Sequence, residues 1–390
     1  MTPITPKTPI KKNELVLLII ILVATLGGLA ISFSLSRDVA KRLAGAKEAA
    51  EPVKLNVIKI TANCPECLDI AAALNDLKKQ PIALSEEKEI SFDSPEGREL
   101  TSSLGIEKIP AYIVRGDIKN KKLAAFFEAN GKIVGDSFVF EKVQPVFVTP
   151  QSGEKHGQLA ALVLYSAVQC PACTDPAPLL EQFKAGGISA SSSTTRTVDP
   201  RGAEGQTLVK NYRITSLPTI LLQGETKLYE QLVSARFGTI EPDGTFVFRA
   251  VSPPYFDAEK NRVAGVVELI SLVDGSCKEC YDVGQHELIL KGTFGVKIGS
   301  SKIIDASSAA GKRLIKQYSI AAVPTVIISP DLSAYDQLVS IWPQVGTAEK
   351  DGWYVFRELK ALGGVAYKDL AANIVVNPVK AAGNATSTVK

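Results

Sequence analysis

Three markers recur along this chain at one long period, and this repeat constrains the fold more than any other feature. All six cysteines belong to Cys-x-x-Cys pairs, whose first members stand 106 and 107 residues apart. A proline before an apolar run recurs at steps of 108 and 106 residues, and an aromatic-Val-Phe triplet at steps of 108. The markers are Cys64, Cys170 and Cys277; Pro110, Pro218 and Pro324; and triplets ending at Phe140, Phe248 and Phe356. Self-similarity at this length indicates three copies of a whole small domain rather than the short units of a solenoid.

Each copy predicts the same order of secondary structure. An apolar strand leads into the cysteine pair and a helix, a second strand ends at an aspartate, and another helix precedes the proline. A strand follows the proline, then a helical stretch, and finally a turn that opens the aromatic-Val-Phe strand. First strands are expected at 55–60, 162–165 and 266–272, and the aspartates are Asp93, Asp199 and Asp305. Strands that alternate with helices favour an α/β fold.

The length of the chain agrees with several domains. At 390 residues it exceeds one ordinary domain, since about 150 residues per domain is the usual expectation. The predicted parts are a tail at 1–14, a transmembrane anchor at 15–35, a stalk at 36–52, domains at 53–155, 156–262 and 263–375, and a disordered tail at 376–390.

The anchor is predicted from residues 15–35, which contain no charged side chain. At about 1.5 Å per residue, a helix of this length spans roughly the 30 Å of a bilayer core. A cleaved signal peptide is the main alternative, but its apolar region is normally only about 7–15 residues long. Basic residues on the two sides do not decide the orientation. Vicinal cysteine pairs indicate redox or metal chemistry, and disulfides persist in an oxidising compartment. We therefore expect a single-pass protein of the cell membrane with its bulk extracytoplasmic.

The cysteine pairs belong to a longer pattern in the second and third copies. Some 40 residues after Cys170, the run from Tyr212 to Thr219 reads Tyr-x-Ile-x-x-x-Pro-Thr, and the run from Tyr318 to Thr325 repeats it. The first copy is looser, with Leu104 and Ala111 at the ends of its run. This combination resembles the thioredoxin family. The resemblance implies three tandem thioredoxin-like domains of α/β fold, which would follow the transmembrane helix predicted at 15–35, and a protein disulfide oxidoreductase activity.

The resemblance also implies a role for each marker residue. The first cysteine of each pair would sit at a helix N-terminus, where unpaired N–H groups stabilise its thiolate for attack on a disulfide. The second cysteine would resolve the mixed disulfide. The proline would follow a cis bond and leave a strand edge on which an extended substrate pairs. The attacking residues are Cys64, Cys170 and Cys277, the resolving residues Cys67, Cys173 and Cys280, and the substrate-positioning prolines Pro110, Pro218 and Pro324.

Some expected features of the family are missing. No carboxylate stands six residues before the first cysteines, where the chain has Ile58, Leu164 and Ser271. The closing helix is expected to be absent or replaced in the first two copies, with 368–374 as the candidate in the third. An aspartate lies two residues past each second cysteine, and we expect it to balance the helix dipole rather than transfer protons. These are Asp69, Asp175 and Asp282.

The charge of the chain gives no case for nucleic acid. Lys and Arg number 44 against 41 Asp and Glu, a net charge of +3, and no basic stripe carries interleaved aromatics. The expected partners are protein thiols and disulfides, a membrane or soluble redox partner, and the lipid bilayer through residues 15–35. No cofactor or metal is expected.

Two other functions compete with disulfide exchange. Cys-x-x-Cys pairs supply half of a zinc site, but a zinc ribbon places its second pair about 15–20 residues away. A redox-inert scaffold of tandem domains is the other alternative, and three intact pairs argue against it. The direction of exchange (oxidation, reduction or isomerisation) stays open.

The residues between the cysteines predict an order of oxidising power. A carboxylate disfavours the nearby thiolate and a lysine favours it. Glu66 stands uncompensated in the first pair, Glu279 is offset by Lys278 in the third, and the second pair encloses no charge. We therefore expect the second pair to be the most oxidising, the third intermediate and the first the least.

Overall fold

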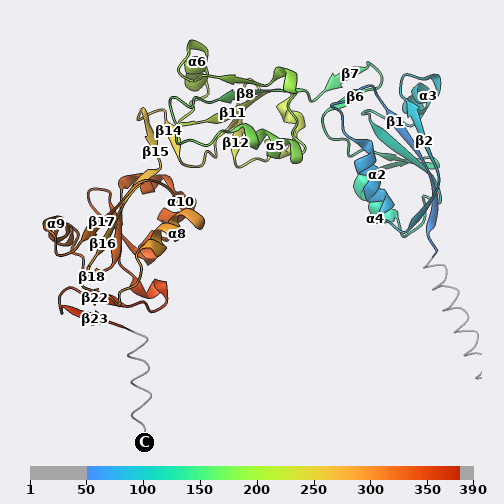
Figure 1. The fold of residues 1–390 in the computed structure, drawn as a ribbon. Coiled ribbons are helices and arrows are strands. Elements are labelled where there is room, and N and C mark those ends of the chain that lie inside the picture. The colour runs from blue at the N-terminus through green and yellow to red at the C-terminus, as the bar shows by residue number, and fades with distance from the viewer. Residues whose placement is uncertain (1–50, 378–390) are drawn as a thin grey trace, which may run out of the picture. The chain divides into compact units, whose positions relative to one another are not determined.

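The structure is a computed structural model that describes residues 51–377 (Figure 1). The predicted tail at 1–14, the anchor at 15–35, almost all of the stalk and nearly all of the C-terminal tail lie outside these residues. Within residues 51–377, no helix combines the length and the hydrophobicity needed to cross a membrane.

The described chain divides into two compact units. The first holds the residues up to Glu154 except 65–67 and 144–147, and the second holds the remainder. One five-stranded sheet lies in the first unit and two lie in the second. Each copy of the repeat therefore forms one sheet, and the division into three domains stays a prediction.

The first sheet has the strand order β2-β1-β3-β5-β4. Its first two strands are parallel, and every other neighbouring pair is antiparallel. In chain order the elements are β1 (Val53–Thr61), α2 (Ile70–Lys78), β2 (Ile82–Ser91), α3 (Pro95–Ser103), β3 (Ala111–Gly116), α4 (Ala124–Asn130), β4 (Gly131–Val134) and β5 (Ser137–Phe140).

The second sheet repeats this order as β9-β8-β11-β13-β12. Its parallel pair is β8 with β9, joined through the helix that follows the cysteines. The elements are β8 (Leu159–Leu164), α5 (Ala177–Ala185), β9 (Arg196–Val198), α6 (Ala203–Asn211), β11 (Thr219–Gly224), α7 (Glu230–Val233), β12 (Gly238–Ile240) and β13 (Phe246–Phe248).

The third sheet repeats the order again as β17-β16-β19-β21-β20. The elements are β16 (Val266–Val273), α8 (Gly284–Gly292), β17 (Lys297–Asp305), α9 (Ala309–Tyr318), β19 (Thr325–Ile328), α10 (Asp336–Ile341), β20 (Gly346–Ala348) and β21 (Tyr354–Phe356).

A β-hairpin follows the last strand of each sheet (Figure 1). Two of the hairpins join a two-residue strand that stands just before the marker proline, and so form three-stranded sheets. The hairpin strands are β6 (Phe147–Thr149), β7 (Glu154–His156), β14 (Tyr255–Asp257), β15 (Arg262–Ala264), β22 (Tyr367–Asp369) and β23 (Ile374–Val376), and the short strands are β10 (Ser216–Leu217) and β18 (Ala322–Val323).

The hairpins replace the closing helix. Its expected absence from the first two copies is confirmed, but the candidate helix at 368–374 is wrong, because these residues form β22, a turn and β23. The Asp369 carboxylate accepts hydrogen bonds from the N–H groups of Ala371 and Ala372, both at 2.9 Å. Asn373 then takes a left-handed conformation at φ 54°. Both features favour a turn over a continuing helix.

The cysteine pair of the second copy lies in one of two cores that sandwich its sheet. Alternate residues of β8 point to opposite faces. Leu159 and Val163 pack with α5 and α7 on one face, whereas Leu162 and Leu164 pack with the cysteines on the other. A fully buried aliphatic side chain such as Leu164 (0% exposed) contributes about 1.5–3 kcal/mol to folding. One face of the second sheet thus packs against the cysteine loop and forms a hydrophobic core with it.

Candidate functional site

All six cysteines are disulfide-bonded, and none is free. Each pair lies in the loop that follows the first strand of its sheet. The Cys170–Cys173 and Cys277–Cys280 bridges have Cα–Cα distances of 5.3 and 5.5 Å. The sequence therefore placed the pairs after the correct strands.

The pairs do not sit at helix N-termini, so this expectation is wrong. The following helices begin at Ile70, Ala177 and Gly284, six or seven residues after the first cysteine. Both cysteines of each pair precede the helix. The helix dipole acts mainly within the first turn, and it therefore does not account for a stabilised thiolate at Cys64, Cys170 or Cys277.

The aspartate beyond each pair explains the late start of the helix. Its carboxylate accepts a hydrogen bond from a backbone N–H group at the beginning of the helix, which satisfies a donor without an intrahelical partner. The bonds are Asp69 to Ala71 (2.9 Å), Asp175 to Ala177 (2.9 Å) and Asp282 to Gly284 (2.8 Å). Each aspartate thus forms a defined hydrogen bond with one N–H group at the helix start. The sequence had predicted only a general electrostatic compensation of the helix dipole.

The bonds before Pro110, Pro218 and Pro324 are cis. In the second and third copies, the second cysteine lies against the residue before the proline. The Sγ atom of Cys173 is 3.7 Å from the carbonyl oxygen of Leu217, and that of Cys280 is 3.9 Å from the oxygen of Val323. A carbonyl oxygen disfavours negative charge on a neighbouring sulfur. This contact favours the first cysteine as the thiolate once a pair is reduced.

The three pairs differ in their exposure. Cys170 and Cys173 are only 3% and 7% exposed, and they pack with Leu217 and Phe256 in an apolar cluster. The cysteines of the other two pairs are half-buried. Solvent and substrates therefore have less access to the second pair than to the first and third.

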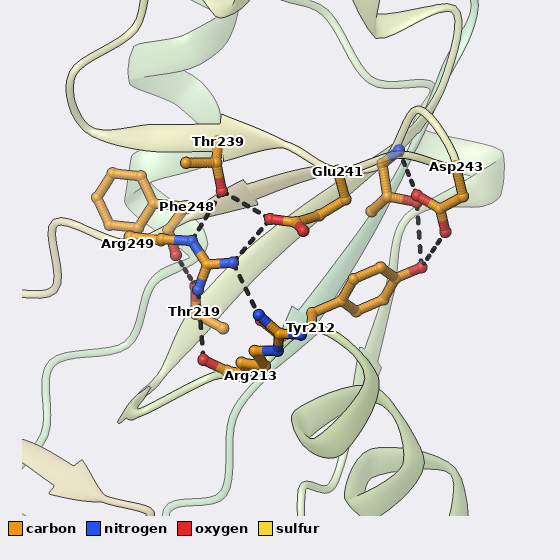
Figure 2. Close-up of polar contacts among 9 residues, drawn as sticks. Tyr212, Arg213, Thr219, Thr239, Glu241, Asp243, Phe248 and Arg249 are labelled. Carbon is orange, nitrogen blue, oxygen red and sulfur yellow. Dashed lines mark hydrogen bonds and ion pairs between the residues drawn. The ribbon is translucent and has the colours of Figure 1, made fainter.

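The tyrosine and threonine of the repeated motif have structural contacts (Figure 2). The Tyr212 hydroxyl donates to the Asp243 carboxylate at 2.8 Å, and the Thr219 hydroxyl donates to the carbonyl oxygen of Phe248. The third copy repeats both bonds, from Tyr318 to Asp351 at 3.0 Å and from Thr325 to Phe356 at 2.6 Å. These residues hold the last strand of each sheet and its preceding turn, and they do not contact the cysteines through these bonds.

An arginine network beside the motif was missed from the sequence. The Arg249 guanidinium donates to Glu241 at 2.7 Å, to Thr239 at 2.8 Å and to the carbonyl oxygen of Tyr212 at 3.0 Å (Figure 2). A signal was available, because the threonine, the glutamate and the arginine each recur 108 positions later, and the tyrosine recurs 106 positions later. In the third copy, Arg357 donates to Glu349 (2.7 Å), Thr347 (2.6 Å) and the Tyr318 carbonyl (2.7 Å).

Two carboxylates near the pairs have cationic partners. Glu66 forms an ion pair with Lys155 at 3.4 Å, so the expectation that it stands uncompensated is wrong. A backbone hydrogen bond, together with Lys155, lowers the pKa of Glu66. Asp274, three residues before Cys277, accepts a hydrogen bond from Lys368 at 2.6 Å. This bond and a bond from Ser276 lower the pKa of Asp274 to about 2.

A half-buried tyrosine and a buried histidine adjoin the third disulfide. The hydroxyl of Tyr281, the residue after Cys280, donates to the carbonyl oxygen of Pro324 at 2.9 Å and lies 2.9 Å from Nε2 of His286. Burial lowers the pKa of His286 to about 4 and raises the pKa of Tyr281. The imidazole is therefore neutral near pH 7 and supports the loop beside the disulfide.

Within residues 51–377, no group of three or more His, Cys, Asp or Glu side chains is placed to hold a metal ion.

Comparisons with known proteins give only distant similarities. No family model and no curated protein matches the sequence. Among solved structures, the chain is similar to ERdj5 form II at 13% identity, over 76% of this chain and 42% of that chain, with a TM-score of 0.16. It is similar to an alkylhydroperoxide reductase of Enterococcus faecalis at 17% identity, over 48% and 90% of the two chains, with a TM-score of 0.15. Human ERp44 gives 10% identity over 75% and 88%, with a TM-score of 0.14.

The chain spans less than half of the length of ERdj5. All three TM-scores lie far below 0.5, and none of these similarities assigns a role to a residue of this chain. The described residues form a mixed α/β protein with several sheets and three Cys-x-x-Cys disulfides.

Proposed function

We propose that this chain is a membrane-anchored thiol–disulfide oxidoreductase that exchanges disulfides with extracytoplasmic protein substrates. The observation that carries the proposal is the Cys-x-x-Cys disulfide that follows the first strand of each of three matching sheets. In two copies the second sulfur also lies against the residue that precedes the cis-proline. The uncharged run at 15–35 and the pairing of every cysteine support the anchor and an oxidising compartment.

We assign the three sheets to tandem thioredoxin-like domains. Each repeats one strand order, in which a parallel pair is joined through the helix after the cysteines. The marker proline then stands at the entrance to the next, antiparallel strand. This arrangement brings the cysteine loop and the proline to the same end of the sheet.

The chemistry is a pair of sulfur displacements. With the third pair oxidised, a substrate thiolate attacks Sγ of Cys277, a new disulfide forms with the substrate, and Cys280 leaves as a thiolate. A second substrate thiolate attacks the mixed disulfide and releases Cys277. The substrate loses two electrons, the protein pair gains them, and the two substrate protons pass to solvent or to the product thiolates. The reverse sequence reduces a substrate disulfide, and the potentials of the partners set the direction.

The second pair has an alternative role as a structural disulfide. Its burial in an apolar cluster favours this role, because a buried sulfur is hard for a substrate thiolate to reach. The first and third pairs are the better candidates for exchange.

A trapping experiment tests the function. In reduced full-length protein carrying Cys280→Ala, the Cys277 thiolate should displace one half of oxidised glutathione and remain in a mixed disulfide, because the resolving thiol is gone. Mass spectrometry of the Cys277 peptide should show the adduct, and Cys277→Ala should not form one at this pair. A reduced chain that forms no adduct at Cys64, Cys170 or Cys277 when each resolving cysteine is replaced would disprove the function.

The anchor needs a separate test. Full-length protein should remain with membranes through an alkaline carbonate wash. A mature chain that starts after residue 32 and is released by the wash would show that the segment is cleaved.

A further inference from the structure

The strand edge beside each cis-proline is already occupied by the chain itself. In the first copy, Ile109 N–H donates to the carbonyl oxygen of Val148 at 2.9 Å, and Val148 N–H donates back at 2.8 Å. In the second copy β10 pairs with β14, with Leu217 opposite Phe256. In the third copy β18 pairs with β22, which is the same antiparallel arrangement. The residue before the proline is paired in all three copies.

The occupant is the hairpin after the last strand of each sheet, and the hairpins are built alike. Each turn contains a residue in the left-handed conformation, at Gly153, Asn261 and Asn373. Asp257 accepts hydrogen bonds from the N–H groups of Glu259 and Lys260, as Asp369 does from the residues that follow it. Turns closed by their own side chains define the hairpins locally.

A strand edge presents one row of N–H and C=O groups, and a single partner strand forms hydrogen bonds with all of them. An extended polypeptide that adds to a sheet needs these groups for its main-chain hydrogen bonds. A small thiol or disulfide needs only access to a sulfur. We propose, on the basis of the function proposed above, that the hairpins occupy the substrate-pairing edge. The sites then exchange with low-molecular-weight thiols and disulfides, and with extended polypeptides only when the hairpin is released.

The third hairpin is held at both ends of the cysteine loop. Before the loop, Lys368 of β22 pairs with Asp274, and their side chains are only 16% and 12% exposed. After the loop, Tyr281 N–H donates to the carbonyl oxygen of Ala366 at 2.9 Å. The hairpin therefore binds the residues that flank Cys277–Cys280 as well as the strand edge.

The second hairpin covers its disulfide more fully. Phe256 of β14 belongs to the apolar cluster that includes Cys170 and Cys173. The Phe256 side chain therefore packs in the cluster that keeps Cys170 and Cys173 buried. Cys277 stays half-buried, so the third pair is the site at which a small thiol has access while the hairpin is docked.

The test compares two substrates at the third pair. We use the full-length chain with Cys64, Cys67, Cys170 and Cys173 replaced by alanine, and measure the rate constants for oxidation of glutathione and of a reduced, unfolded polypeptide with two cysteines. Lys368→Met removes the clamp and should raise the polypeptide rate about tenfold, which corresponds to about 1.4 kcal/mol. The glutathione rate should stay within about twofold, because Cys277 is already accessible to a small thiol.

Matched variants control for charge and for folding. Lys360→Met removes a surface charge from the same copy and should change neither rate, and Lys368→Arg should preserve the slow polypeptide rate. If Lys368→Met fails to fold, Asp369→Ala loosens the hairpin turn instead, and it should also raise only the polypeptide rate. If the chain oxidises neither glutathione nor the polypeptide, exchange at the third pair itself is disproved. The hairpin proposal would be overturned if both substrates are oxidised and Lys368→Met leaves the polypeptide rate unchanged. It would also be overturned if Lys368→Met raises the polypeptide rate only by the same factor as the glutathione rate.

Discussion

Lys368 Nζ lies 2.6 Å from Asp274 Oδ2 and so joins the hairpin of the third copy to the loop that leads into Cys277. The two residues are 94 positions apart. Both side chains are largely buried, so water screens this pair less than an exposed one. The ion pair ties the geometry of the third disulfide to the docking of the hairpin.

Asp274→Asn should destabilise the third copy above about pH 4. The pKa of Asp274 is lowered from 3.8 to about 2 in the folded chain, so its ionised form stabilises folding. This contribution is present above the unfolded pKa and is lost as the pH falls through the folded pKa. We expect a loss of about 2 kcal/mol at pH 7 that shrinks towards zero near pH 2. The chain's two tryptophans, Trp342 and Trp353, lie in this copy, so their fluorescence follows its unfolding.

A difference between variant and wild type that is equal at pH 7 and pH 2 would contradict this account. Asp336→Asn is a suitable control, because Asp336 is an acidic residue of the same copy at the start of α10, outside the loop that contains Cys277 and Cys280.

The second disulfide should be the slowest of the three to be reduced. Its burial limits the approach of a thiolate and disfavours the thiolates that reduction produces. We therefore expect dithiothreitol to reduce Cys170–Cys173 at least about tenfold more slowly than the other pairs, although the intervening residues predict this pair to be the most oxidising at equilibrium. Timed alkylation followed by peptide mass spectrometry measures the three rates in one chain.

Phe256→Ala should speed the reduction of this pair, because Phe256 packs in the cluster around it. Phe237→Ala makes an equal deletion in the core on the other face of the same sheet and should have little effect. If Cys170–Cys173 is reduced first in the wild type, burial does not control these rates.

The sequence predicted the features that repeat or are local. The recurring triplets became β5, β13 and β21, the apolar run at 55–60 lies within β1, and the cis-prolines were expected. Hydrophobic pattern and spacing carry this information because strands and turns are specified by nearby residues.

The contacts around the cysteine pairs were not predicted, because they join residues far apart in the chain. Lys155 and Glu66 are 89 positions apart, and Lys368 and Asp274 are 94 apart. The pairing of β22 with β18 is also non-local, which is why residues 368–374 suggested a helix. The late helix starts, by contrast, had a local signal in Asp69, Asp175 and Asp282, which are residues that favour helix caps.

The first cysteine of a reduced pair should react before the second. The carbonyl oxygens of Leu217 and Val323 lie close to the sulfurs of Cys173 and Cys280 and disfavour thiolates there. Brief iodoacetamide treatment of the reduced chain at mildly acidic pH should therefore label Cys277 before Cys280. Peptide mass spectrometry gives the ratio, and preferential labelling of Cys280 would reverse the assignment of the nucleophile.

Arg357→Met should destabilise the third copy without changing disulfide exchange. The variant loses the hydrogen bonds to Glu349, Thr347 and the Tyr318 carbonyl. The bonds to Glu349 and Thr347 are exposed to solvent, so we expect a total loss of about 1 kcal/mol. Arg313→Met, which removes an exposed arginine on α9, is the matched control and should cost little. Denaturant unfolding followed by tryptophan fluorescence measures both losses. Glutathione oxidation by the folded Arg357→Met variant should be as fast as in the wild type, because the arginine network braces the last strand of the sheet. A slower rate under native conditions would show that the network also positions Pro324 beside the cysteines.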